Sequence, residues 1–145
     1  MFAANVRAIL LVLVCAGLAG CAKRTAQVNG VIVYADTPDE PATDLEGYTV
    51  TFESADGKGS SVGFIGADGK FTMSTDKDGD GALRGKMKVA VTPPIQLSDS
   101  SLGPSKIDPR HHAFETSGLD LEVGPRDNQI TLKVDRKPRP GAKPQ

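Results

Sequence analysis

The sequence predicts an all-β protein, an antiparallel β-sandwich of seven strands that follows a cleaved N-terminal segment. Apolar residues alternate with polar ones in several segments, which is the period of a strand with one buried face. Gly, Pro, Asn and Asp residues separate these segments, and no segment beyond residue 26 has the period of a long helix. Several short strands with turns between them are typical of an antiparallel sandwich.

The chain divides into four expected parts. Residues 1–20 are the signal peptide, residues 21–26 a short tether, residues 27–135 the β-sandwich domain, and residues 136–145 a tail. The domain is long enough to bury one hydrophobic core without a disulfide or a metal. The tail is rich in Pro, Lys and Arg and has no large apolar side chain, so nothing would offset its ordering entropy and we expect it to be disordered.

The N-terminal segment has the features of a signal peptide in their usual order. Arg7 supplies a positive charge, and residues 8–17 (AILLVLVCAG) are an uncharged apolar stretch, shorter than the roughly 20 residues of a membrane-spanning helix. Residues 18–21 (LAGC) resemble the lipobox of bacterial lipoproteins, in which the cysteine thiol is joined to diacylglycerol. We therefore expect cleavage before Cys21 and lipid attachment at that residue. Cys15 would be lost with the signal, which leaves no internal disulfide.

This lipid anchor determines the expected location. In the lipoproteins that the segment resembles, the cysteine carries acyl chains such as palmitate, and each buried CH₂ contributes about 0.8 kcal/mol to membrane binding. Ala22 follows the cysteine in place of the Asp that retains many such lipoproteins at the inner membrane. The resemblance therefore implies an envelope protein on the outer membrane, facing the periplasm or the exterior.

The predicted strands follow the alternation of apolar and polar residues. Residues 48, 50 and 52 are apolar, whereas residues 49, 51 and 53 are polar. This is the alternation of a strand with one buried face. Gly57 and Gly69 each follow an Asp at an expected turn, where glycine permits positive φ. In chain order, the predicted strands are residues 28–34, 48–53, 62–64, 71–74, 86–92, 119–123 and 130–134.

A long connection follows the fifth predicted strand. Pro93 and Pro94 end that strand because proline cannot donate to a sheet ladder. Residues 93–118 then exceed the usual length of a loop, so the segment either binds a partner or packs on the domain as a crossover. Five large apolar residues are available for packing: Ile95, Leu97, Leu102, Ile107 and Phe114.

Several segments together resemble the carboxypeptidase regulatory-like domain, a transthyretin-like (prealbumin-like) β-sandwich within the broader immunoglobulin-like class. They are residues 28–31 (VNGV), 48–52 (YTVTF), 67–71 (ADGKF), 79–82 (GDGA) with 85–89 (GKMKV), and 116–119 (TSGL) with Asn128. The resemblance implies a sandwich fold and a surface location. It implies no activity, because this domain is generally an accessory module and a fold does not determine function.

Asp76, Asp78 and Asp80 form the most distinctive polar pattern. Carboxylates at alternate positions before a glycine match the first half of a calcium-binding loop. The second half does not match, since Met87 stands where the bidentate Glu would be and Arg84 adds a positive charge. The alternatives are a calcium site with these three ligands and an acidic, solvated loop between strands.

Other chemistries have less support in the sequence. His111 and His112 are adjacent, so their side chains would point apart in an extended chain, and we expect them in an exposed loop rather than in a metal site. The serines of residues 98–105 lack a G-x-S-x-G elbow. The 17 basic and 18 acidic residues nearly balance and form no basic stripe, which argues against nucleic acid.

The expected function is therefore a non-enzymatic binding or structural accessory module that is anchored to a membrane through Cys21. Its partner would be another envelope protein or a glycan, and the sequence specifies no oligomeric state. The alternative is a calcium-dependent module that uses the Asp76, Asp78 and Asp80 loop. No other cofactor is expected.

Overall fold

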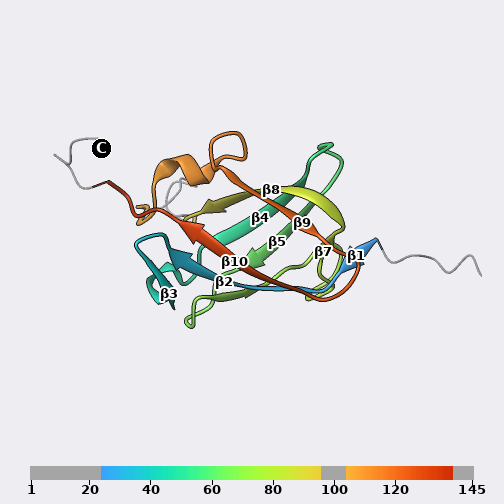
Figure 1. The fold of residues 1–145 in the computed structure, drawn as a ribbon, viewed down its shortest axis with the longest axis horizontal. Helices are drawn as coiled ribbons and strands as arrows, with labels where there is room; N and C mark the ends of the chain where they lie inside the picture. The colour runs from blue at the N-terminus through green and yellow to red at the C-terminus, as the bar shows by residue number, and fades with distance from the viewer. Residues whose placement is uncertain (1–23, 96–103, 139–145) are drawn as a thin grey trace, which may run out of the picture.

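A computed structural model describes residues 24–95 and 104–138, and within these ranges the protein is all-β (Figure 1). The ranges contain no α-helix, only two short 3₁₀ segments, and no helix in them is long and apolar enough to cross a membrane. The elements in order are β1 (Thr25–Ala26), β2 (Val28–Tyr34), β3 (Thr37–Pro41), η1 (Thr43–Leu45), β4 (Thr49–Ser54), β5 (Ser60–Phe64), β6 (Lys70–Thr72), β7 (Ala82–Leu83), β8 (Gly85–Thr92), η2 (Pro109–His112), β9 (Leu119–Val123) and β10 (Asn128–Val134).

The strands form two four-stranded sheets and a short ribbon. In the first sheet β2 is central, with β10 on one side and both β3 and β6 on the other, and the second sheet has the order β5-β4-β8-β9. β1 and β7 form the ribbon. One pairing corrects the antiparallel expectation, because β10 runs parallel to β2 from the pair Asn128 and Val28 to the pair Val134 and Tyr34.

Apolar side chains from both sheets form one core. Phe52 of β4 and Phe71 of β6 belong to different sheets, and their rings meet edge to face with centroids 6.5 Å apart. Such a pair contributes about 0.5–1.5 kcal/mol beyond the area that it buries. The alternation expected for residues 48–53 is confirmed, since the even positions are buried and the odd ones are not. Core residues at or below 4% exposure include Val28, Ile32, Val50, Phe52, Val89, Val91, Leu132 and Val134.

The expected number of strands is too low. Each of the seven predicted segments contains a strand, but β1, β3 and β7 are additional. β1 and β7 have two residues each, which is too short to show a period. β3 lies between the first two predicted strands and contains two prolines; prolines are accepted there because β3 is at the edge of its sheet.

The described domain extends past both of its predicted boundaries. β1 begins at Thr25, inside the expected tether, and pairs with Leu83. Arg136 lies in the expected tail, yet its guanidinium stacks 3.5 Å above the Tyr34 ring and pairs with Asp36 at 3.0 Å. These contacts offset the entropy cost of ordering Arg136 and the chain next to it. The signal peptide, Cys21 and residues 139–145 lie outside the described residues.

The domain has two opposite ends, which β2 connects over roughly 20 Å (Figure 1). We call the end with β1, β7 and the turns at residues 55–59 and 124–127 the β1 end. The other, the hairpin end, holds the turn between β5 and β6 together with η1, because Gly69 in that turn lies directly against Pro41 and Ala42.

The described part of the long connection packs against the domain. Ile107 is fully buried and pairs with Arg136 beyond the end of β10. His111 in η2 is only 2% exposed, which corrects the expectation of an exposed histidine pair. Residues 104–118 therefore pack against the domain, and they belong to the connection between the neighbouring antiparallel strands β8 and β9. Leu97 and Leu102 lie outside the described residues.

Candidate functional site

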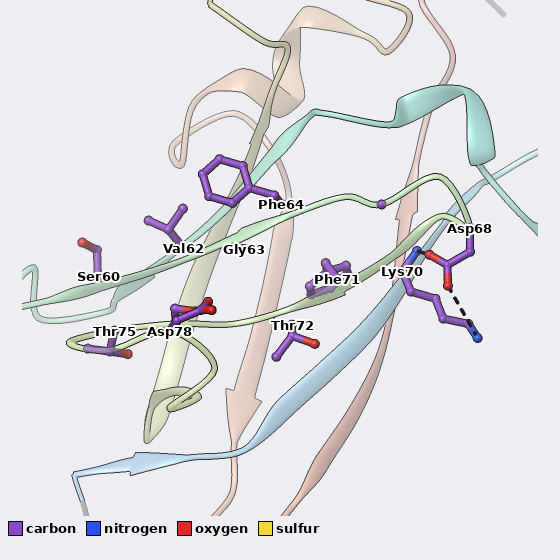
Figure 2. Close-up of a pocket in the computed structure, with 12 residues that line it drawn as sticks. Ser60, Val62, Gly63, Phe64, Asp68, Lys70, Phe71, Thr72, Thr75 and Asp78 are labelled. Carbon is purple, nitrogen blue, oxygen red and sulfur yellow. Dashed lines mark hydrogen bonds and ion pairs between the residues drawn. The ribbon is translucent and has the colours of Figure 1, made fainter.

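A groove opens between β5 and β6, where the chain passes from one sheet to the other (Figure 2). Its volume is about 760 Å³. Asp68 and Gly69 form the tight turn at the hairpin end, and Gly69 has the positive φ that the sequence predicts there. The lining residues are Ser60, Val62, Gly63, Phe64, Gly66, Asp68, Lys70, Phe71, Thr72, Ser74, Thr75 and Asp78.

The backbone geometry of the hairpin creates the opening. Val62 and Ser74 exchange two backbone hydrogen bonds of 2.8 Å at one end of the groove. At the other end the Gly66 N–H donates to the Lys70 carbonyl, also at 2.8 Å. Phe64 and Thr72 occupy the intervening position of the same register, but among the described residues no backbone hydrogen bond joins them. The two strands therefore separate at this one position.

Gly63 permits the strands to cross closely beside this opening. A Cβ atom at Gly63 would lie 2.8 Å from the Thr72 carbonyl oxygen and 2.9 Å from the Met73 sulfur. Both distances are shorter than real Cβ contacts, and one of the atoms is backbone, which cannot move aside easily. Only glycine therefore fits at this crossing.

Phe64 is the exposed aromatic residue of the groove. Its side chain is 69% exposed, whereas Phe71 across the groove is 3% exposed and belongs to the core. The register pairs Phe64 with Thr49 on the outer face of the second sheet. Figure 2 shows Val62 and Phe64 on the same side of β5. The sequence alone did not indicate this, because an apolar residue in an alternating strand is normally expected to face the core.

Polar groups line both ends of the groove. Asp68 and Lys70 form an exposed ion pair at 3.9 Å, and the Asp68 carboxylate also accepts the Lys70 backbone N–H at 3.1 Å. Near the other end, the Thr75 hydroxyl donates to the Gly81 carbonyl at 2.8 Å. The groove thus combines hydroxyls, one ion pair and an apolar ring, and no His or Cys lines it. These groups suit the binding of a ligand through hydrogen bonds and apolar contact.

Asp76, Asp78 and Asp80 lie in the loop between β6 and β7, and their roles differ. The Asp80 carboxylate accepts backbone N–H groups from Thr75 at 2.6 Å and from Asp76 and Lys77 at 3.1 Å each. These bonds, above all the one from Thr75, lower the pKa of Asp80 below its ordinary value. Both oxygens of Asp80 therefore organise the loop.

The three carboxylates do not converge in the structure. Within residues 24–95 and 104–138, no group of three or more His, Cys, Asp or Glu side chains is arranged to hold a metal ion. The calcium alternative remains a prediction, and the Asp80 geometry supplies a reason for this sequence pattern that requires no ion.

His111 connects η2, in the segment between β8 and β9, to the end of β10. Its Nδ1 donates to the Ser117 carbonyl at 3.1 Å, so its Nε2 is the acceptor for the Asp135 backbone N–H at 3.0 Å. Arg110 forms an ion pair with the Asp135 carboxylate. All polar atoms of this ring are thus used to hold two segments of the domain together.

His112 has a different environment. Its Nε2 lies 3.0 Å from the Ser105 hydroxyl, but that hydroxyl also donates to the Ile107 carbonyl at 2.8 Å and accepts the Ile107 N–H at 3.2 Å. Burial, followed by the neighbouring His111, lowers the pKa of His112. The serine is thus held in a local turn that uses its hydroxyl.

Comparisons with known proteins give one structural likeness. No protein-family model matches the chain, and no curated protein matches it. A solved structure of a DUF3823 family protein from Parabacteroides merdae is similar over 77% of this chain, with 12% sequence identity and a TM-score of 0.45. The match covers 46% of that protein, so this chain spans about half of its length.

Proposed function

We propose that the chain is an exported lipoprotein that is cleaved before Cys21, acylated there and held on the outer membrane as a non-enzymatic binding module. The support for the anchor is the order of charge, apolar stretch, small residues and cysteine in residues 7–21. In this proposal the two sheets form a β-sandwich of the transthyretin-like kind.

The position of the first strand favours this arrangement. Only residues 22–24 separate Cys21 from β1, and a chain extends by at most about 3.6 Å per residue. An acylated Cys21 would therefore hold the β1 end within roughly 15 Å of the lipid. The hairpin end, with Phe64, would face away from the membrane.

The exposed Phe64 beside the groove is the observation that carries the binding role. The Phe64 side chain is exposed, so a partner can cover it. Burying a phenylalanine side chain would contribute about 1.5–3 kcal/mol to the binding free energy. The ring and the neighbouring hydroxyls suit a partner with apolar and hydrogen-bonding groups, which fits either another envelope protein or a glycan.

Cross-linking of intact cells followed by purification of the tagged protein tests this role. We expect a partner that is recovered with the wild type and with Ile95→Ser, but not with Phe64→Ser. Ile95 is the matched control because its side chain is 64% exposed and does not line the groove. Equal recovery with Phe64→Ser would refute the groove as the contact surface. Equal recovery with Cys21→Ser would show that binding does not depend on the anchor.

A further inference from the structure

Two arginines face each other at the β1 end. The antiparallel ribbon pairs Thr25 with Leu83 and Ala26 with Ala82. Extended by one position outward, this register sets Arg24 opposite Arg84. The Arg84 N–H donates to the Arg24 carbonyl at 3.2 Å, which continues this register. Side chains at directly opposed positions start about 5 Å apart on the same face, and like charges there are unfavourable unless an anion lies between them.

No protein group of the described ranges supplies that anion. Neither arginine has a carboxylate within ion-pair distance in residues 24–95 or 104–138. The Nε of Arg84 is buried and has no hydrogen-bond acceptor. A buried donor without a partner is costly, so this N–H favours an acceptor that the described residues do not supply.

The surroundings leave space for the arginine side chains. A Cβ atom at Gly59 would lie 3.2 Å from Nη2 of Arg24, so this glycine makes room for the guanidinium. Two of the nearby acids are engaged elsewhere, since Asp56 accepts the Ser54 hydroxyl and Asp80 accepts backbone N–H groups. The other acidic residues of this end are Asp76, Asp78, Glu122 and Asp127.

We propose that Arg24 and Arg84 bind the phosphate group of a membrane phospholipid. This proposal rests on the proposed anchor, because acylation at Cys21 would place the pair beside the lipid headgroups. Guanidinium groups bind phosphate through parallel N–H···O bonds, so a phosphate between the two would relieve their repulsion. The Arg84 side chain must turn outward for its buried Nε to join this contact. The β1 end then rests on the bilayer in a defined orientation.

The Nε–H resonance of Arg84 in ¹⁵N NMR tests the proposal directly. The acylated protein is compared in phosphatidylglycerol nanodiscs and in dodecyl maltoside micelles, which contain no phosphate. We expect the resonance to shift in nanodiscs, the shift to be lost in Arg24→Gln, and the shift to persist in Arg126→Gln, which removes a charge at the same end. The dispersion of backbone amide signals verifies that each variant is folded.

Each other outcome overturns a specific part of the proposal. An equal loss of the shift in Arg126→Gln would replace the arginine pair with a general charge effect. A shift with inorganic phosphate in micelles, but none in nanodiscs, would assign the site to free phosphate. An unchanged resonance in both would remove the site. If the purified protein carries no acyl chain, the anchor fails by itself, and the phosphate titration of that protein still tests the arginine pair.

Discussion

Replacing Gly30 with alanine places a methyl group where the ring of Phe71 lies. The new Cβ would be 2.1 Å from Cζ of Phe71 and 2.6 Å from its Cε1. Phe71 is 3% exposed and packs edge to face on Phe52, so the ring cannot move aside without disturbing the core.

The expected cost follows from two opposing contributions. Overpacking of a core costs about 1–3 kcal/mol, and disturbing the aromatic pair costs a further 0.5–1.5 kcal/mol or so. Alanine in a strand recovers about 0.5–1 kcal/mol relative to glycine. We therefore expect Gly30→Ala to lower the free energy of unfolding by about 2–3 kcal/mol.

Urea unfolding followed by circular dichroism at 25 °C measures this cost. Gly124→Ala is the control, because the nearest atom to its Cβ would be 3.5 Å away, and we expect a change within about 0.5 kcal/mol. In a Phe71→Leu background the cost of Gly30→Ala should fall by about 1 kcal/mol or more, because the smaller side chain leaves space for the new methyl group. Interaction energies of ~0.5–3 kcal/mol are usual between residues in contact. An equal cost in both backgrounds would refute the steric explanation.

Three further predictions concern polar groups. Burial and the hydrogen bond to Asp44 raise the pKa of Tyr34, so the stability that Tyr34→Phe removes should be fully present below pH ~10 and decline at higher pH, as measured by urea unfolding across that range. Asp80→Ala should lower the melting temperature more than Asp78→Ala, and the difference should shrink as the pH falls through the lowered pKa of Asp80; millimolar calcium should leave the wild-type melting temperature unchanged, and a rise would favour the calcium alternative. His111→Ala should cost about 2–4 kcal/mol in urea unfolding, because it leaves a cavity and two unpaired backbone groups.

The strand positions were predictable because one-sided burial leaves a period of two in the sequence. The direction and partner of each strand were not, since alternation separates the two faces of a strand but does not specify which neighbour pairs with it. β10 alternates in the same way whether it runs parallel or antiparallel to β2. The ribbon of β1 and β7 was missed because strands of two residues have no measurable period.

The site residues were harder to predict for a related reason. Phe64 is a large apolar residue of the kind expected in a core, and only its pairing with Thr49 reveals that it lies on the outer face. His111 looks like a loop residue in the sequence, but its two hydrogen-bonding partners are the Ser117 carbonyl and the backbone N–H of Asp135, which lies 24 positions away. Asp80 resembles a calcium ligand because loop-organising and metal-binding aspartates use the same spacing before glycine.

The intact mass of the protein extracted from membranes tests the central proposal most directly. The account predicts a chain that begins at Cys21 and carries the added mass of diacylglycerol and acyl chains, and it predicts that Cys21→Ser abolishes this added mass. A chain that begins at another residue, or one that begins at Cys21 without any lipid, would contradict the membrane anchor and the orientation of the domain that depends on it.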